Sequence, residues 1–361
     1  MKPATFALGG CTIHVGSGLL DRAAAIAQDA VRAHRWAIVS DTNVAPHYAK
    51  RVAKGFTDAP AQLFTVPAGE AHKTRESWAR LTDEMLAAGC ARDAAVLALG
   101  GGMVGDLAGF VAATFMRGIP VVQVPTTLLA MIDASIGGKT GVDTPAGKNL
   151  VGAFHDPAAV IADPQTLATL PARELRAGAA EAIKHGAIAD AGYFHRLTDS
   201  FAAAFDAPSG EEMHRLIAGS IRIKTAVVAS DAKERGLRKT LNFGHTLGHA
   251  VEAASGYALL HGEAVSIGMV LEARLAERIG VAATGTAAAV EDAVEGAGLP
   301  SALPAGMDAA RLIELTHADK KSRAGAVEYA LPSRIGMMSA QDRGWSMPVK
   351  DADVRKVLAG A

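Results

Sequence analysis

Three histidines lie close together in the segment LNFGHTLGHAVEAASGYALLHGE, which spans residues 241–263. His245 and His249 are four residues apart, so on a helix their imidazole rings lie on one face. His261 follows a turn, where a third ligand of a divalent metal could stand. The spacing alone therefore predicts His245 and His249 as metal ligands, with His261 or a carboxylate as the third. The alternative is that these histidines cap helices or belong to the core.

A carboxylate from another segment could complete such a metal site. Glu181 stands among alanines in a predicted helix at residues 172–188, with Lys184 one turn later. A hard oxygen ligand beside two imidazoles is typical of a zinc site that keeps one position open. The spacing does not connect segments so far apart in the chain, so a Glu/His/His site that includes Glu181 is a hypothesis.

A second polar stretch, DASIGGKTGVDTPAGKNLVGAF, spans residues 133–154 and contains five glycines and two lysines. The glycines allow sharp turns and a close approach of backbone amides to a ligand. Lys139 and Lys148 add positive charge, which suits a phosphate or a carboxylate. We interpret the stretch as a long glycine-rich loop that binds an anion. The alternative is a surface loop with two solvated lysines.

A glycine fingerprint follows the apolar run at residues 94–99, which is typical of a buried strand. Gly100, Gly102 and Gly105 match G-x-G-x-x-G, and a helix pattern follows them. The amides at the start of such a helix can bind a pyrophosphate. Asp41 ends an earlier predicted strand, where it could bind a ribose hydroxyl or cap the next helix, and its position favours capping.

The composition limits the classes of function. The chain has 361 residues with 36 basic and 37 acidic side chains, a net charge of −1. This balance argues against partners such as nucleic acid or a membrane surface. Two cysteines make no disulfide framework. The apolar segment 94–116 contains an aspartate and five glycines, so it is better explained as strand, loop and helix than as a membrane span. We expect a cytoplasmic enzyme.

The order of the patterns predicts two domains. An early strand pair at residues 5–16 precedes alternating helices and strands, with strands at 36–40, 62–66, 94–99 and 120–125 and helices at 21–34 and 73–88. This alternation predicts an α/β domain at residues 1–165. Residues 166–361 are predicted to be mostly helical, with helices near 172–188, 193–206, 211–231, 245–256, 262–279, 285–297 and 308–318 and a short strand at 327–331.

Several long motifs together resemble those of the 3-dehydroquinate synthase family, within the sugar-phosphate cyclases. They occur in the family's order between about residues 36 and 336, and they read GGGMVGDLAGF, PTTLLAMIDASIGGKTGVDTPAGKNLVGAF, AGAAEAIKHGAI, KTLNFGHTLGHAVE and HGEAVSIGM. The resemblance implies an α/β NAD-binding domain, a mostly α-helical metal-binding domain with Zn²⁺ or Co²⁺, and an active site between them. It also implies a homodimer, with Arg117 acting across the dimer interface.

The resemblance assigns roles motif by motif. It implies Glu181, His245 and His261 as metal ligands, and His249 as a substrate contact instead of the ligand that its spacing predicts. The implied catalytic residues are Asp133, Lys139, Lys184, Lys224, Arg238, Asn242 and His249. The implied substrate-binding residues are Arg117, Lys148, Asn149 and Lys320, with Lys321 as the alternative to Lys320. The implied NAD-binding residues are Asp41, Asn43, Glu70, Lys73, Gly101, Gly102, Asp106, Thr126, Thr127, Lys139, Lys148 and Thr169.

The implied substrate is 3-deoxy-D-arabino-heptulosonate 7-phosphate, which the family converts to 3-dehydroquinate in the shikimate pathway. NAD⁺ takes hydride from a ring alcohol, phosphate is eliminated, the hydride returns, and an aldol closure forms the carbocycle. Two alternatives are a cyclase acting on sedoheptulose 7-phosphate or glucose 6-phosphate, and a metal-dependent polyol dehydrogenase of related fold. A third is a binding protein without activity. Arg238 and Lys224 favour a carboxylated substrate, and Lys139, Lys148 and Asn149 favour a phosphorylated one.

Overall fold

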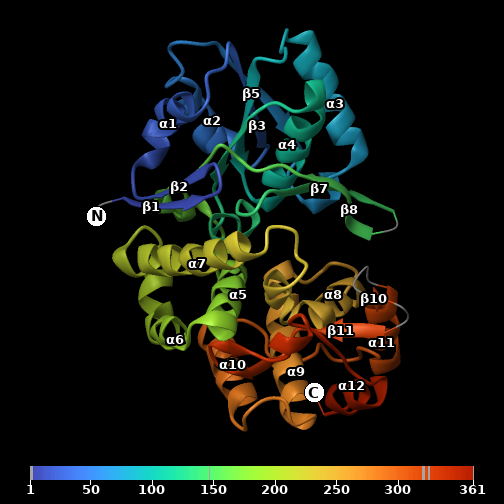
Figure 1. The fold of residues 1–361 in the computed structure, drawn as a ribbon. Coiled ribbons are helices and arrows are strands. Elements are labelled where there is room, and N and C mark those ends of the chain that lie inside the picture. The colour runs from blue at the N-terminus through green and yellow to red at the C-terminus, as the bar shows by residue number, and fades with distance from the viewer. Residues whose placement is uncertain (1–2, 146, 319–321, 324–325, 361) are drawn as a thin grey trace. The chain divides into compact units, whose positions relative to one another are not determined.

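The structure is a computed structural model that describes residues 3–145, 147–318, 322–323 and 326–360 (Figure 1). Its contacts divide the chain into two compact units. Unit 1 comprises Met1–Leu170 and Ala207–Thr225, and unit 2 comprises Pro171–Asp206 and Ala226–Ala361. The domain boundary placed after residue 165 stays a prediction; residues 207–225, which follow that boundary, group with the first unit.

Unit 1 is built on a sheet that contains, among the described residues, seven strands in the order β1-β2-β9-β6-β5-β3-β4. β1 and β2 form an antiparallel hairpin, and the remaining neighbours pair in parallel. The strands are β1 (Ala4–Leu8), β2 (Cys11–Val15), β3 (Arg35–Asp41), β4 (Ala61–Val66), β5 (Ala94–Gly100), β6 (Val121–Pro125) and β9 (Ala159–Ala162). The predicted strands are confirmed, while β9 was not predicted.

Helices cover both faces of this sheet (Figure 1). They are α1 (Ala23–Ala30), α2 (Ala45–Ala53), α3 (Arg75–Ala87) and α4 (Gly102–Thr114), with 3-10 turns η1 (Leu19–Arg22), η2 (Glu70–His72), η3 (Phe115–Arg117) and η5 (Pro164–Thr169). Successive side chains of β3 enter different cores: Ala37 and Val39 pack in one, Trp36 and Ile38 in the other. A strand buried on both faces explains the unbroken apolar runs in the sequence.

The glycine-rich stretch that we interpreted as a loop is a hairpin. β7 (Lys139–Thr144) pairs with β8 (Gly147–Phe154) in antiparallel register, after a π-helical turn, η4, at Ala130–Ala134. The loop prediction failed because the glycines hide the strand pattern. A Cβ at Gly152 would lie 2.1 Å from the Thr140 carbonyl oxygen, so close backbone pairing accounts for a glycine here.

Unit 2 is mostly helical, as predicted. Its helices are α5 (Ala172–Ala189), α6 (Ala191–Asp206), α8 (His245–Ala254), α9 (His261–Arg278), α10 (Thr286–Gly296), α11 (Ala309–Ala318) and α12 (Asp351–Leu358), with a 3-10 turn η6 (Leu237–Asn242). α7 (Glu211–Ser230) runs through residues of both units. Short strands β10 (Ser322–Arg323), β11 (Ala326–Tyr329), β12 (Pro332–Arg334), β13 (Met337–Met338) and β14 (Met347–Pro348) and the turn η7 (Gln341–Arg343) lie near the C-terminus. No helix in the described residues is long and apolar enough to span a membrane.

Candidate functional site

Glu181, His245 and His261 lie together in unit 2, although they come from three helices, α5, α8 and α9. The Nε2 atoms of His245 and His261 are 3.5 and 3.7 Å from the same carboxylate oxygen, Oε1 of Glu181. Two ligands of a tetrahedral zinc ion, each about 2.0–2.2 Å from it, are about 3.3–3.6 Å apart. The spacing of these three atoms therefore fits a divalent metal.

Small residues bring the three helices this close. A Cβ at Gly262, next to His261, would lie 1.9 Å from the carbonyl oxygen of Ala177, one turn before Glu181. A Cβ at Gly268 would lie 2.0 Å from the carbonyl oxygen of Gly244, which precedes His245. Only glycine permits such backbone contact, so these positions set how near α9 comes to α5 and α8.

The second nitrogen of each histidine ring has an acceptor in the same unit. His245 Nδ1 is 3.1 Å from the backbone oxygen of Phe243, and His261 Nδ1 is 3.4 Å from Glu252 Oε2. An acceptor at Nδ1 favours the tautomer with its proton there, which presents the lone pair of Nε2 to a metal. Both Nε2 atoms are also the ones that approach Glu181. The residues thus fit a bound divalent cation in donor type as well as spacing.

The charges of this group are strongly coupled. Burial lowers the pKa of His261, but hydrogen bonds and charges from Glu181 and Glu252 outweigh it and raise the pKa to about 9. Lys184, which is 2 % exposed, forms an ion pair with the fully buried Glu181. A buried carboxylate that is shared by a lysine and two imidazoles points to a functional site.

His249 lies beside the metal-ligand group. Its ring centroid is 5.3 Å from that of His245 and 5.9 Å from that of His261. A second arrangement of possible ligands combines His249, Glu252 and His261. In that arrangement Glu252 would bind the metal, although it already lies at Nδ1 of His261. The arrangement with Glu181 keeps this contact between Glu252 and His261, and we therefore prefer it. The ligand set that spacing alone predicted, His245 with His249, is not the arrangement we prefer.

Glu272 of α9 fixes the start of α8. Its two oxygens accept hydrogen bonds from the backbone N–H groups of Gly244 (2.7 Å) and Leu247 (2.9 Å). A carboxylate here satisfies otherwise unpaired amides and lies at the positive end of the helix dipole. Because His245 is the first residue of α8, this fully buried glutamate holds a predicted metal ligand in place.

Arg238 and Asn242 belong to η6, the turn before α8. Arg238 is buried, and its guanidinium donates to the Ala232 carbonyl oxygen at 2.7 Å. The Asn242 side-chain amide donates to Glu234 Oε1 at 2.7 Å. The two predicted substrate residues thus lie on one turn, η6, that precedes α8 and its predicted metal ligand His245.

In unit 1, several of the predicted NAD residues lie at the carboxyl ends of the strands. β3 pairs with β4 on one side and with β5 on the other, so the strand order reverses between β3 and β5. Ligands of open α/β sheets bind outside such a reversal point. Asp41 ends β3, and Gly101 and Gly102 follow β5 at the start of α4.

Hydrogen bonds and close packing hold these residues in place. Asp41 Oδ1 accepts hydrogen bonds from the N–H groups of Asn43 (2.8 Å) and Val44 (2.9 Å), in the turn that precedes α2. A Cβ at Gly101 would lie 3.1 Å from the Thr127 methyl group, so glycine keeps the backbone close to β6. Thr126 is buried beside it at the end of that strand.

Lys73 lies at the centre of a buried ionic cluster in unit 1. It forms an ion pair with Glu70, and its Nζ is 3.4 Å from Asp106 Oδ2 and 3.6 Å from Asp143 Oδ1. Burial lowers the pKa of Lys73, but the charges of Asp106 and Glu70 outweigh it and raise the pKa above its usual value. Burial, only partly offset by Lys73, raises the pKa of Asp106 to about 6.

The remaining predicted residues of unit 1 fall into smaller groups. Lys224 Nζ contacts both Asp133 Oδ1 (2.5 Å) and the Asp133 backbone oxygen (2.6 Å), so these two predicted catalytic residues are paired. The hairpin carries the others: Lys139 begins β7, and Lys148 and Asn149 lie on β8. Thr169 is the last residue of η5, and its hydroxyl group forms a hydrogen bond with the Tyr48 hydroxyl at 2.7 Å. Lys320, with its alternative Lys321, lies outside the described residues.

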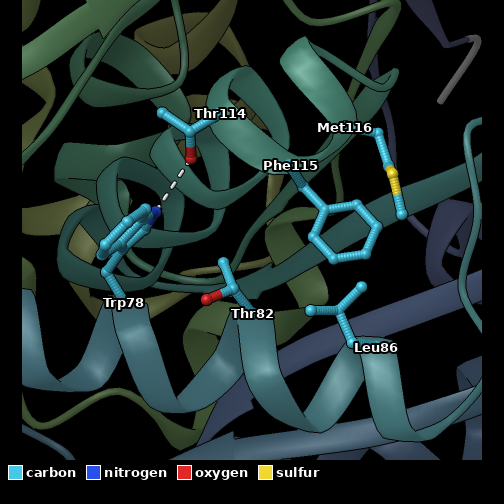
Figure 2. A pocket seen from close by; sticks show the side chains of 6 residues that line it. All are labelled: Trp78, Thr82, Leu86, Thr114, Phe115 and Met116. Carbon is cyan, nitrogen blue, oxygen red and sulfur yellow. Dashed lines mark hydrogen bonds between the residues drawn. The ribbon is translucent and has the colours of Figure 1, made fainter.

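Arg117 ends η3, next to an apolar pocket of about 260 Å³ (Figure 2). The pocket is lined by Trp78, Thr82, Leu86, Thr114, Phe115 and Met116. Trp78 closes one end by donating its indole N–H to Thr114 Oγ1 at 2.8 Å. Met116 and Arg117 both have positive φ values, 51° and 71°. The residues that line the pocket include no charged side chain.

Sequence reasoning assigned no role to Glu272 or Asp143, and it considered Glu252 only as a carboxylate near the histidines that could be a third metal ligand. Each is a carboxylate that contacts a predicted site residue or its neighbour. Glu252 lies at Nδ1 of His261, Glu272 accepts the N–H of Gly244 next to His245, and Asp143 accepts the N–H of Asn149. For Glu252, its helical spacing of three residues from His249 was an available signal. Glu272 and Asp143 had none, because only the fold brings their partners near: backbone N–H groups for Glu272, and the Asn149 N–H and the Lys73 ammonium group for Asp143.

Comparisons with known proteins indicate the same family over most of the chain. The family model described as "3-dehydroquinate synthase N-terminal" matches residues 63–177, and "3-dehydroquinate synthase C-terminal" matches residues 178–322. A 3-dehydroquinate synthase of Xylella fastidiosa (strain 9a5c) is 45 % identical over 360 residues, covering 97 % of this chain and 90 % of that protein. One of Symbiobacterium thermophilum is 48 % identical over 332 residues, covering 90 % and 91 %.

Solved structures of other cyclases are also similar. A 2-deoxy-scyllo-inosose synthase, complexed with carbaglucose-6-phosphate, NAD⁺ and Co²⁺, has a TM-score of 0.90 at 25 % identity and full coverage of both chains. ValA, a 2-epi-5-epi-valiolone synthase from Streptomyces hygroscopicus with NAD⁺ and Zn²⁺ bound, has a TM-score of 0.87 at 31 % identity, covering 100 % and 97 %. A probable glycerol dehydrogenase from Sinorhizobium meliloti, at 17 % identity and a TM-score of 0.68, shares the fold.

Proposed function

Because this chain belongs to the 3-dehydroquinate synthase family, we propose that it converts 3-deoxy-D-arabino-heptulosonate 7-phosphate to 3-dehydroquinate and inorganic phosphate. The observation that carries the proposal is the identity of 45–48 % to 3-dehydroquinate synthases over at least 90 % of the chain. The chain is thus an NAD-dependent sugar-phosphate cyclase that acts as a phosphate-eliminating carbon–oxygen lyase in aromatic biosynthesis. We place it in the cytoplasm as a homodimer.

The redox chemistry is supplied by NAD, which is reduced and re-oxidised within one turnover. We assign the cofactor to unit 1, at the strand ends that carry Asp41, Gly101 and Gly102. The first amides of α4 would bind its pyrophosphate, and the helix dipole would add to this attraction. The carboxylates around Lys73 outnumber it three to one, so they can accept hydrogen bonds from ribose hydroxyl groups.

A divalent cation, Zn²⁺ or Co²⁺, would polarise the alcohol oxygen of the substrate and make its proton easier to remove. In the proposal Glu181, His245 and His261 hold this cation in unit 2. His249, whose ring lies beside both ligand histidines, is then available to the substrate. Lys184 neutralises part of the charge of Glu181, and so moderates how strongly that carboxylate donates to the cation.

The substrate carries a phosphate and a carboxylate, and each group needs charged partners when it leaves water. We assign the phosphate to Lys139, Lys148 and Asn149 on the hairpin, with Arg117 and Lys320 as further cations. We assign the carboxylate to Arg238, Asn242 and Lys224. Lys224 also contacts Asp133, so the pair can orient a reacting hydroxyl group and pass a proton to or from it.

A second candidate function follows from the solved structures. The similar proteins at 25 % and 31 % identity are a 2-deoxy-scyllo-inosose synthase and a 2-epi-5-epi-valiolone synthase, so the fold also supports other cyclisations. The carboxylated substrate is favoured by the higher identity, 45–48 %, to 3-dehydroquinate synthases.

The experiment that tests the function compares three substrates. Purified, metal-loaded protein with catalytic NAD⁺ is given 3-deoxy-D-arabino-heptulosonate 7-phosphate, sedoheptulose 7-phosphate or glucose 6-phosphate, and released phosphate is measured. We expect release from the first substrate alone. Release from a sugar without a carboxylate, and none from the first, would replace this proposal by the second candidate.

A further inference from the structure

The β7–β8 hairpin is irregular at Asp143. The pairing register shifts between Val142 and Thr144, where the single residue Asp143 faces residues 148–150 of β8. Bulges of this kind bend a strand and redirect its side chains, and they often lie beside functional sites. This bulge contains both Lys148 and Asn149, to which the proposed function gives the substrate phosphate.

Asp143 makes two contacts that account for the irregularity. Its backbone N–H leaves the hairpin and donates to the Lys73 carbonyl oxygen at 2.7 Å. Its Oδ1 accepts the backbone N–H of Asn149 at 2.8 Å. Asn149 has a φ of 54°, in the left-handed region that few non-glycine residues adopt, and this hydrogen bond helps to hold it there.

The same Oδ1 atom lies 3.6 Å from Lys73 Nζ. Lys73 is also surrounded by Glu70 and Asp106, so its one positive charge is distributed over three carboxylates. If the Asp143 charge were lost, Lys73 would interact more strongly with the other two. Their oxygens would then be less available to accept hydrogen bonds from the ribose of NAD.

We propose that Asp143 is a positioning residue that couples the two halves of the proposed site in unit 1: it shapes the bulge that presents Lys148 and Asn149, and it shares Lys73 with the carboxylates of the NAD-binding group. This inference rests on the proposed function. It adds a residue to which neither the family motifs nor the comparisons assign a role.

Two substitutions separate the two contacts. In Asp143→Asn the amide oxygen can still accept the Asn149 N–H, but the charge beside Lys73 is gone. In Asp143→Ala both contacts are lost. We expect Asp143→Ala to raise the KM for 3-deoxy-D-arabino-heptulosonate 7-phosphate and the Kd of NAD⁺ by about tenfold each, and to lower kcat less. Asp143→Asn should restore the KM to within about threefold of wild type while NAD⁺ binding stays weakened.

The matched control is Asp83→Asn at an exposed position of α3, which should leave both constants and the melting temperature unchanged. A purely structural role would lower the melting temperature in both Asp143 variants without separating KM from the Kd of NAD⁺, and this result would overturn the inference. Unchanged constants in Asp143→Ala would do the same. If Asp143→Ala does not fold, Asp143→Asn alone must show the separation. If wild type has no activity, the proposed function fails, while NAD⁺ affinity still tests the contact with Lys73.

Discussion

Two ionic groups of this chain, one around Glu181 and one around Lys73, have opposite charge balances. Around Glu181, one carboxylate is shared by Lys184 and two imidazoles, so basic groups outnumber the acid. Around Lys73, three carboxylates share one ammonium group. In the proposed function, the first group presents imidazole lone pairs to a cation, and the second presents carboxylate oxygens to the hydroxyl groups of NAD. The difference indicates that charge balance, together with donor type, predicts which ligand each group takes.

The origins of the two groups differ as well. The metal-ligand group depends on three helices that glycines allow to touch, and its outer partners Glu252 and Phe243 lie in the same unit. The Lys73 group depends on a turn, a helix start and a hairpin bulge. Packed helices hold ligands more rigidly than turns do, which suits a metal with strict bond lengths.

The largest effect should follow from breaking the metal-ligand group. His261→Ala should abolish turnover and lower the bound metal, because a ligand is lost from a site with only three protein donors. Metal content by atomic emission and phosphate release measure the two outcomes. His249→Ala is the matched control: it should keep the metal and lose activity through the substrate. Full activity of His261→Ala with unchanged metal content would remove His261 from the ligand set.

Removing a cation from the hairpin should have the next largest effect. Lys148→Ala should reduce kcat/KM by about 10- to 100-fold, since a charge-assisted hydrogen bond to a desolvated phosphate is worth about 1.5–3 kcal/mol. Steady-state phosphate release at several substrate concentrations measures it. The matched control is Lys54→Ala, at the end of α2. An unaltered kcat/KM would show that Lys148 is a solvated surface residue that does not bind the phosphate.

A milder change tests the partner of His261. Glu252→Gln should weaken metal affinity by about 10- to 100-fold, because an amide holds the Nδ1 proton less strongly than a carboxylate. Competition with a chromophoric chelator gives the affinity directly, and activity at saturating metal should fall much less than in His261→Ala. Affinity equal to that of wild type would show that Glu252 does not orient His261.

The smallest effect concerns stability and pH in the Lys73 group. Asp106 has a pKa of about 6, above its ordinary value of 3.8, so its charge costs the folded state stability above pH 6. Asp106→Asn should therefore be more stable than wild type at pH 7, by about 1–2 kcal/mol, since the side chain is 21 % exposed and partly screened. The difference should vanish as pH falls from 6 towards 4. Urea denaturation across this range decides it, and a variant that is less stable at pH 7 would contradict the account.

Much of the fold could be predicted because the relevant signals are local. Apolar runs gave β3, β5 and β6, and helical periodicity gave α8 and α9 within a few residues. The hairpin could not be predicted, because its glycines serve backbone contacts and weaken the strand pattern. The short strand β9 was missed because only its place between β2 and β6 makes it part of the sheet.

The candidate site was predictable in part for the same reason. Spacing marked His245 and His249 because they share a helix face, but no spacing rule connects Glu181 on α5 with His261 on α9. Their proximity arises from the contact of Gly262 with Ala177. The resemblance to a family supplied the combination of Glu181, His245 and His261, and the structure places these residues together. Their roles in catalysis remain a prediction for the experiments above.

The most direct test of the central claim is to follow phosphate and NADH in the same reaction. Metal-loaded protein is mixed with 3-deoxy-D-arabino-heptulosonate 7-phosphate and a small amount of NAD⁺. The account predicts that phosphate is released over many turnovers per NAD⁺ while no NADH accumulates, because the hydride is returned in each cycle. Accumulation of NADH without phosphate would contradict it and would indicate a dehydrogenase on the same fold.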